Sequence, residues 1–278
     1  MTPVAPDIPQ TLRRADRDRY LSVLYTPEDK RDALFALYAF NAEIASIRDR
    51  IREPLPGEIR LQWWRDAIAD EAGQGHPLAE ALIATIRAHG LPKKAFDDYL
   101  EARIFDLYDD PMPDRAALEG YCGETASALI QLAALILDPD AAPAAAEAAG
   151  HAGCAQAITG MLRLLPLHRA RGQCFVPTDI LAALGLTPET FLAAHDRAAA
   201  GCAVEAFAAL AGEHLTRFGS LAARLPGSLT PAFLPLAVTG AYLGTIARNP
   251  AASLDKSVDI STLKRHWLML RKAGRGWT

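Results

Sequence analysis

The stretch TPEDKRDALFALYAFNAEIASIRDRI, residues 26–51, decides the fold class of this chain. Thr26-Pro27-Glu28-Asp29 is typical of a helix start, with Thr26 as the N-cap and Pro27 at the first helical position. The apolar residues that follow recur in alternating steps of four and three, which puts them on one helix face. They are Ala33, Leu37, Phe40, Ile44, Ile47 and Ile51. The pattern predicts one amphipathic helix that ends near Ile51, with a second stripe beside the first formed by Tyr38, Asn41, Ala45 and Asp49.

Helical periodicity continues along the rest of the chain, and no segment shows sustained strand alternation. After a break at Glu53–Gly57, helices are predicted at 59–72, 77–89, 93–108, 114–137, 142–165, 188–225, 231–247 and 261–272. Helices without strands indicate an all-α protein. We predict a single domain over residues 1–278, with a core at about 10–250 and an extension, 251–278, that carries a short basic helix.

Composition excludes several classes of protein. Half of the 278 residues are apolar and 22% are charged, which is typical of a globular chain. The net charge is −4 and the basic residues are spread along the sequence, so there is no electrostatic footprint for nucleic acid. The start, MTPVAPDIPQ, resembles neither a secretory signal nor a transit peptide, and we therefore expect a cytoplasmic protein.

Neither the cysteines nor the uncharged stretch near the end of the chain indicates a special role. The four cysteines form no C-x-x-C pair, which argues against a zinc site and predicts small buried residues: Cys122, Cys154, Cys174 and Cys202. Leu225–Ala247 contains no charged residue and is long enough to be considered as a membrane span. Three prolines interrupt it, so a buried core helix is the better interpretation.

Several segments in order carry a resemblance to a known family. Ala36-Leu37-Tyr38-Ala39-Phe40 resembles the start of the first signature of squalene and phytoene synthases, which condense prenyl diphosphates head to head. Asp106-Leu107 with Leu118 and Tyr121-Cys122 resembles the family's central helix pair. The segments 153–163 and 171–186 resemble the second signature and the stretch that follows it. The resemblance implies the all-helical isoprenoid-synthase architecture with a central cavity.

The resemblance also shows where the metal-binding motifs of such enzymes would lie. Active members carry two D-x-x-x-D motifs on facing helices, and these hold magnesium ions around the substrate diphosphates. Residues at i and i+4 share a helix face, and magnesium prefers oxygen ligands. The first motif corresponds here to Ala45 and Asp49, and Ser46 stands where an aspartate usually follows the first position. One carboxylate of the pair is therefore a methyl group.

The second motif corresponds to Leu164 and His168, which supply no carboxylate. Pro166 predicts that this helix ends near Leu165, because a proline inside a helix costs ~3 kcal/mol. A single Asp49 cannot organise several magnesium ions around a diphosphate, and electrostatic stabilisation is usually the largest catalytic contribution. We therefore treat the four motif positions as vestigial and expect no metal site and no cofactor, with magnesium required only if the chain is an enzyme.

One branch of the family is especially similar. The residues that carry this similarity are Phe40-Asn41-Ala42-Glu43-Ile44-Ala45, Gln156, Arg163, Pro166, His168 and Arg171. The branch contains the mitochondrial complex I assembly factor of the squalene/phytoene synthase family and its bacterial relatives. The resemblance implies a retained fold, a lost reaction and a respiratory-complex subunit or membrane-associated protein as partner, with a location at the inner membrane as an alternative to the cytoplasm.

The remaining candidates have two interpretations each. Cavity or anion-binding roles are assigned to Tyr38, Asn41, Tyr121, Gln156, Arg163, Arg169 and Arg171. Guanidinium groups suit diphosphates, but surface ion pairs explain the arginines equally well. Asp106, Asp109 and Asp110 resemble an aspartate-rich box, although Pro111 favours a solvated helix end. Residues 263–277 mix basic side chains with Trp and Leu, as membrane-surface helices do, although a packed terminal helix is favoured.

Three functions follow from these expectations. The leading hypothesis is a non-catalytic binding or assembly factor, and its main rival is a prenyltransferase that condenses farnesyl or geranylgeranyl diphosphate. A lipid carrier is the third, because burial of an isoprenoid chain in an apolar cavity does not need metals.

Overall fold

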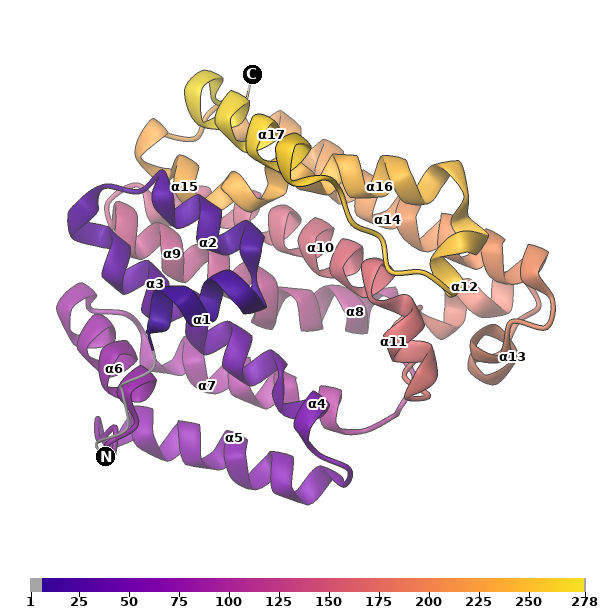
Figure 1. The fold of residues 1–278 in the computed structure, drawn as a ribbon, viewed down its shortest axis with the longest axis horizontal. Helices are drawn as coiled ribbons and strands as arrows, with labels where there is room; N and C mark the ends of the chain where they lie inside the picture. Colours follow the sequence, from indigo (N-terminus) through magenta and orange to yellow (C-terminus); the bar gives the residue numbers. More distant parts are fainter. Residues whose placement is uncertain (1–6, 278) are drawn as a thin grey trace. The chain divides into compact units, whose positions relative to one another are not determined.

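The computed structural model describes residues 7–277 (Figure 1). Within that range the chain is built from α-helices joined by short 3₁₀ and π-helical turns, and it contains no strand. The all-α class predicted from the sequence is confirmed.

The described chain divides into two compact units. The first unit comprises the described residues of Met1–Tyr108 together with Ala128–Ala146 and Pro226–Pro235. The second unit comprises Asp109–Ser127, Glu147–Leu225 and the described residues of Leu236–Thr278. The prediction of a single domain over residues 1–278 stays a prediction.

The helices of the first unit come from three parts of the chain. They are α1 (Ile8–Ala15), α2 (Arg17–Leu24), α3 (Glu28–Ala45), α4 (Ile47–Arg50), α5 (Pro54–Ala69), α6 (Pro77–His89), α7 (Lys93–Ala102), η1 (Arg103–Leu107), α9 (Ala128–Leu137), η3 (Ala142–Ala145), η4 (Gly227–Leu229) and α15 (Thr230–Phe233). The short 3₁₀ helix η5 (Leu234–Val238) leads from the first unit into the second.

The second unit holds the other helices of the described chain. They are α8 (Arg115–Cys122), the π-helix η2 (Gly123–Ser127), α10 (Ala146–Arg163), α11 (Leu165–Ala170), α12 (Thr178–Ala183), α13 (Pro188–Ala193), α14 (Arg197–Ala222), α16 (Thr239–Arg248), η6 (Pro250–Leu254) and α17 (Thr262–Arg275).

Helix α3 forms the centre of the first unit, with α1, α2, α6 and α9 packed against it. The predicted apolar stripe is buried from Ala33, at 8% exposure, to Ile47 in α4, at 1%, whereas its last member, Ile51, is half-buried after the end of α4. The Phe40 ring meets Trp64 and Phe96 edge-on, with ring centroids 5.2 and 5.7 Å apart. Edge-to-face aromatic contacts at this spacing add to the energy of simple burial.

Helix α3 is shorter than predicted. The N-cap is Pro27 rather than Thr26, and no side chain caps the helix start. At the other end α3 stops at Ala45, and Ser46 turns the chain into α4. The Ser46 hydroxyl donates to the Glu43 carbonyl over 2.8 Å, a local bond that competes with continued helix. The prediction of one helix to Ile51 is wrong in this last turn.

Other predicted helices also differ from the structure. Helix α5 begins at Pro54, inside the predicted break, because prolines in a first turn sacrifice no helical hydrogen bond. The predicted helix 114–137 is interrupted by η2, and the predicted helix 188–225 is two helices, α13 and α14. Ala194 separates this last pair with a φ of 50°, a left-handed conformation that ends α13.

Helix α14 is the longest element of the second unit, and α12, α13, α16 and η6 pack against it. Helix α10 lies very close to η2 because Gly153 has no side chain. A Cβ on Gly153 would lie 2.1 Å from Ser127 Oγ and 2.3 Å from Ser127 N. The Ser127 hydroxyl donates to the Gly150 carbonyl over 3.0 Å, so the close approach is also hydrogen-bonded.

Two stretches, Arg115–Leu137 and Gly227–Arg248, are long and apolar enough to cross a membrane by length and composition alone. Their most apolar windows are 56% and 67% buried, respectively, as core helices also are. The second stretch contains the predicted helix 231–247, which the structure divides into α15, η5 and α16. Pro231 and Pro235 lack the backbone N–H that a continuous helix needs.

Candidate functional site

The first motif lies in the first unit, where the helix is interrupted. Ala45 is the last residue of α3 and Asp49 belongs to α4, and both are exposed. The Asp49 backbone N–H donates to the Ser46 carbonyl over 3.1 Å. The two motif positions are therefore not successive turns of one regular helix, which is what pairing at i and i+4 requires.

Tyr38 and Asn41 precede that motif on α3 and are buried. The Tyr38 hydroxyl is removed from water, and burial raises its pKa to about 12. Asn41 Oδ1 accepts a hydrogen bond from Tyr99 over 2.9 Å. The Arg103 guanidinium donates to Tyr99 over 3.2 Å. Buried polar groups of this kind are satisfied within the unit, so Tyr38 and Asn41 sit in its packed interior.

Asp106 completes this buried network and corrects one sequence interpretation. Its carboxylate pairs with Arg103 over 2.9 Å, and both side chains are about 15% exposed or less. The solvated helix end expected for the aspartate-rich segment therefore describes Asp109 and Asp110, which are exposed, but not Asp106. Asp106 and its partner Arg103 both belong to η1, three residues apart.

The second motif lies in the second unit, between α10 and α11. Helix α10 ends at Arg163 and α11 begins at Leu165 with Pro166 in its first turn, so the predicted interruption near Leu165 is confirmed. Leu164 joins the two helices and is 46% exposed. His168 is half-buried against Phe175, with ring centroids 4.8 Å apart. The position of the first carboxylate is thus an apolar side chain open to solvent.

The donors at the four motif positions do not fit magnesium. Asp49 supplies carboxylate oxygens, whereas Ala45 and Leu164 supply none and His168 supplies an imidazole. Magnesium demands near-octahedral oxygen coordination, and imidazole suits other metals. In the described residues, no three His, Cys, Asp or Glu side chains gather as ligands for a metal ion. We derive no catalytic step through magnesium at these positions.

The three candidate arginines lie in the second unit, and two of them bind its backbone. Arg163 Nε donates to the Val258 carbonyl over 3.0 Å, and its guanidinium lies 3.8 Å from the Tyr242 ring centroid. Arg169 donates to the carbonyls of Leu192 and Leu254. These contacts favour a structural role for Arg163 and Arg169 over an anion-binding role. Arg171 ends α11 and is half-buried.

Tyr121 and Gln156, the other predicted cavity residues, also belong to the second unit. Tyr121 lies at the end of α8, half-buried, with its ring centroid 6.4 Å from that of Phe175. Gln156 is half-buried on α10. The contacts of Phe175 bring Tyr121 and His168 to the same ring. Their cavity-lining roles stay predictions.

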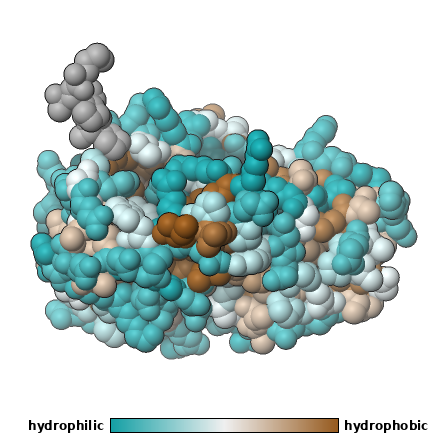
Figure 2. Space-filling model, turned by 90° about the horizontal axis from the view of Figure 1, so that it is seen from below, coloured by the Kyte–Doolittle hydropathy of each residue, from teal (hydrophilic) through white to brown (hydrophobic). Residues whose placement is uncertain are grey.

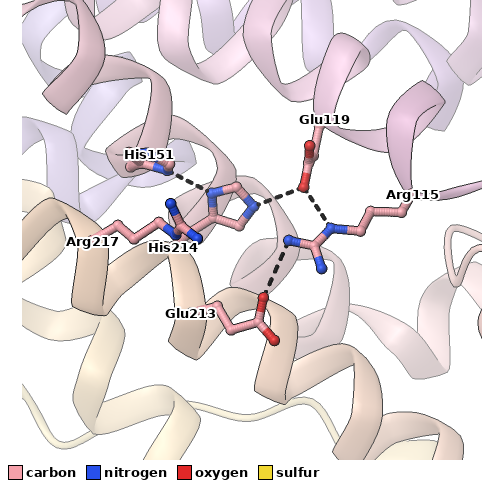
Figure 3. Close-up of a pocket in the computed structure, with 6 residues that line it drawn as sticks. All are labelled: Arg115, Glu119, His151, Glu213, His214 and Arg217. Carbon is pink, nitrogen blue, oxygen red and sulfur yellow. Dashed lines mark hydrogen bonds and ion pairs between the residues drawn. The ribbon is translucent and has the colours of Figure 1, made fainter.

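A separate polar pocket of about 240 Å³ lies wholly within the second unit (Figure 3). Helices α8, α10 and α14 supply its lining side chains, namely Arg115, Glu119, His151, Glu213, His214 and Arg217. The two imidazoles face one another with Nδ1 atoms 3.0 Å apart, and His214 Nε2 lies 3.2 Å from Glu119. Arg115 bridges the rim, with Nε 2.7 Å from Glu119 and a terminal nitrogen 3.1 Å from Glu213.

The partners assign the protons in this pocket. A carboxylate only accepts, so His214 Nε2–H donates to Glu119. Burial lowers the pKa of His214 and keeps the ring neutral, which leaves its Nδ1 as an acceptor for His151 Nδ1–H. Burial alone would raise the pKa of Glu119, but the hydrogen bond and charge of Arg115 hold it below the ordinary value.

The six side chains that line the pocket are carboxylates, guanidinium groups and imidazoles. None of them is Ser, Thr or Cys. Its volume is below the ~300–1,000 Å³ of pockets that enclose drug-sized ligands. The charge of Arg115 is offset by two glutamates. The pocket was not predicted from the sequence, because its hydrogen bonds join residues as far as 63 and 98 positions apart.

The cysteines lie partly as predicted. Cys122, Cys154 and Cys174 are buried, but Cys202 on α14 is exposed, which corrects the expectation for that residue. A hydrogen bond from the Cys122 thiol lowers the pKa of Cys154. Burial raises the pKa of Cys174 to about 11, so that thiol stays protonated.

The all-α architecture is the isoprenoid synthase fold. A dehydrosqualene synthase crystallised with a ligand superimposes with a TM-score of 0.80 at 18% identity, over 95% of this chain and 93% of that one. At that identity the likeness concerns the fold alone. The sequence model of the squalene/phytoene synthase family matches residues 12–265. The chain belongs to the squalene/phytoene synthase family.

Within the family, the chain is similar to two kinds of protein. NADH dehydrogenase (ubiquinone) complex I, assembly factor 6, from Rattus norvegicus is 32% identical over 242 residues, which are 86% of this chain and 72% of that protein. Presqualene diphosphate synthase from Rhodopseudomonas palustris is 29% identical over 170 residues, which are 60% of this chain and 61% of that protein. The match to the assembly factor is thus the longer one.

Proposed function

We propose that this chain is a non-catalytic assembly factor for respiratory complex I that acts by binding. The observation that carries the proposal is the second motif, where Leu164 is exposed between two helices and no carboxylate is present. Without metal ions, a diphosphate leaving group would stay unneutralised. The 32% identity to a complex I assembly factor supports the same conclusion.

The proposal has consequences for partner and location. A respiratory-complex subunit or another membrane-associated protein would be the partner, and the protein would act in the cytoplasm at the surface of the inner membrane. The proposal also includes an isoprenoid or another lipid as a ligand of the protein, because squalene and dehydrosqualene synthases share its fold.

Gene deletion tests the proposal in the cell. Loss of the gene should lower the amount of assembled complex I, measured on native gels and as NADH oxidation, while hopanoid and carotenoid levels stay unchanged. The wild-type gene and an Asp49→Ala version should both restore the complex. Loss of hopanoids or carotenoids with normal complex I would overturn the proposal.

The rival function is head-to-head condensation of prenyl diphosphates, favoured by the similarity to a presqualene diphosphate synthase. It is tested by incubating the purified chain with farnesyl or geranylgeranyl diphosphate, magnesium and NADPH. We expect no condensed product. Turnover that Asp49→Ala abolishes and that Asp97→Ala, at an exposed aspartate on α7, leaves intact would establish the rival.

A further inference from the structure

Helix α17 carries an exposed row of large apolar side chains. Leu263, Trp267 and Leu270 are 81%, 55% and 61% exposed, respectively. Their spacing of four and then three residues puts them on one helix face. We call these three residues the apolar ridge. The rest of the described chain leaves the ridge open to solvent.

The opposite face of α17 holds the helix in place. Met269 is fully buried, and the Arg265 guanidinium, 4% exposed, lies 2.8 Å from the Tyr242 hydroxyl and 2.7 Å from Asp259 Oδ1. After the helix, the Trp277 ring meets Phe218 of α14 with centroids 4.9 Å apart. The ridge is therefore presented by an anchored helix, and the packing predicted for this helix accounts for one face only.

Basic side chains lie along one side of the ridge. At about 100° per residue, Lys264, Arg271 and Arg275 lie roughly 80–120° around the helix axis from Leu263. All three are exposed, and the Arg271 guanidinium lies 4.8 Å from the Trp267 ring centroid. Residues 261–278 contain no Asp or Glu. The exposed surface of α17 thus combines apolar bulk with positive charge alone.

Helix α5 shows that exposed apolar residues by themselves do not make such a surface. Leu55 and Ile59 are 64% and 62% exposed. Figure 2 shows that apolar side chains gather among hydrophilic ones on the face that it draws. The charges beside this pair are mixed, with Glu58 and Arg60 adjacent to Ile59. The charges on α17 therefore favour an anionic partner, whereas the mixed charges on α5 favour neither an anionic nor a cationic one.

We propose that α17 docks on an anionic lipid bilayer, with the apolar ridge in the boundary between headgroups and acyl chains. Lys264, Arg271 and Arg275 would then lie at the level of the anionic headgroups, each strengthening binding about fivefold. Tryptophan favours this boundary because its ring is apolar and its N–H is polar. An interfacial helix needs an apolar face, a basic polar face and no acidic charge between them. The proposal rests on α17 and does not depend on the proposed function.

Vesicle sedimentation with the full chain tests the docking. The wild-type protein should sediment with vesicles of phosphatidylcholine and phosphatidylglycerol in equal parts, and much less with phosphatidylcholine alone. Trp267→Ser with Leu270→Ser should weaken binding more than about tenfold, because two apolar side chains lose their burial in lipid. Lys264→Glu with Arg271→Glu should weaken it at least about 25-fold, and high salt should act in the same direction.

Matched controls separate the ridge from general effects. Leu55→Ser with Ile59→Ser removes an equally exposed apolar pair, and Arg14→Glu with Lys256→Glu reverses two exposed charges elsewhere. Both controls should bind as the wild type does. Equal binding to both kinds of vesicle, or full binding by the ridge variant, would overturn the proposal. Self-association that the ridge variant loses, without vesicle binding, would assign the ridge to a second copy instead.

Discussion

The motif positions and the polar pocket differ in how many titratable side chains they contain and in whether those side chains contact one another. At the motif positions, Asp49 is exposed, His168 packs against an aromatic ring, and Ala45 and Leu164 are apolar. In the pocket, two histidines, two glutamates and two arginines line about 240 Å³. Hydrogen bonds join the side chains of the pocket across three helices.

This contrast distinguishes polar side chains that stabilise the fold from polar side chains that would bind a catalytic metal. A buried polar network stabilises a fold when every member is satisfied, and the pocket has that property for Glu119 and His214. A metal site needs carboxylates that converge on one point without pairing with each other first. The family fold is therefore kept here by residues that are unrelated to its metal chemistry. Four predictions test this contrast.

The largest effect is expected at Gly153 on α10. Gly153→Ala should lower the free energy of unfolding by about 3 kcal/mol or more, because its Cβ would overlap the backbone of η2. Gly160→Ala on the same helix meets nothing within 4 Å and should gain about 0.5–1 kcal/mol from helix propensity. Urea denaturation of both variants measures the difference. Equal effects would show that the close approach of α10 to η2 is wrong.

A smaller loss is expected in the pocket. Glu119→Ala should cost about 1–3 kcal/mol, since it leaves the buried Nε2–H of His214 without an acceptor. Glu119→Gln keeps an acceptor and should cost less. Asp49→Ala, at an exposed motif position, should change stability by no more than about 0.5 kcal/mol. A larger loss from Asp49→Ala than from Glu119→Ala would reverse the comparison.

The sequence predicted the class and most helices because apolar periodicity reports directly on burial. Ala33, Leu37 and Phe40 repeat at helical spacing, and all three are buried. The end of α10 was predictable from Pro166, because the proline ring removes a backbone N–H and clashes with the preceding turn. The interruption at Ser46 was not, because it depends on one hydroxyl that returns to the backbone.

The pocket and the ridge show why the rest escaped prediction. His151, His214 and Glu119 come from three distant segments, and only the packing of α8, α10 and α14 brings them together. Asp106 was expected in solvent because the prediction ignored its pairing with Arg103. For α17 the composition was visible, but which face is covered was decided by Tyr242, Asp259 and Phe218.

Acid should weaken the second unit through His214. Burial lowers the pKa of His214 in the folded protein, whereas an unfolded histidine titrates near about 6.5. Between about 6.5 and the folded pKa, the unfolded chain binds a proton that the folded chain does not, so the free energy of unfolding falls as pH falls. Urea denaturation from neutral to mildly acidic pH measures this slope.

His214→Gln should flatten that slope relative to the wild type. His151, Glu119, Arg115 and Arg217 face the same pocket and remain in the variant. His89 is the control, because burial also lowers its pKa in the first unit, so His89→Gln should remove only its own separate contribution. A slope unchanged by His214→Gln would show that the ring is not held neutral by burial.

The smallest effect is expected from magnesium at the motif positions. A ligand that binds only the folded chain raises its stability according to the ratio of its concentration to its Kd. One exposed carboxylate at Asp49 gives magnesium no site of useful affinity. Magnesium chloride should therefore leave the thermal midpoint of the wild type the same as in a magnesium-free salt of equal ionic strength. Ala45→Asp with Leu164→Asp adds two exposed carboxylates and should itself change stability by at most about 0.5 kcal/mol. A magnesium-dependent rise in the thermal midpoint of the wild type that Asp49→Ala removes would mean that the first motif still binds a metal ion. The motif positions would then not be vestigial, and their contrast with the pocket would fail.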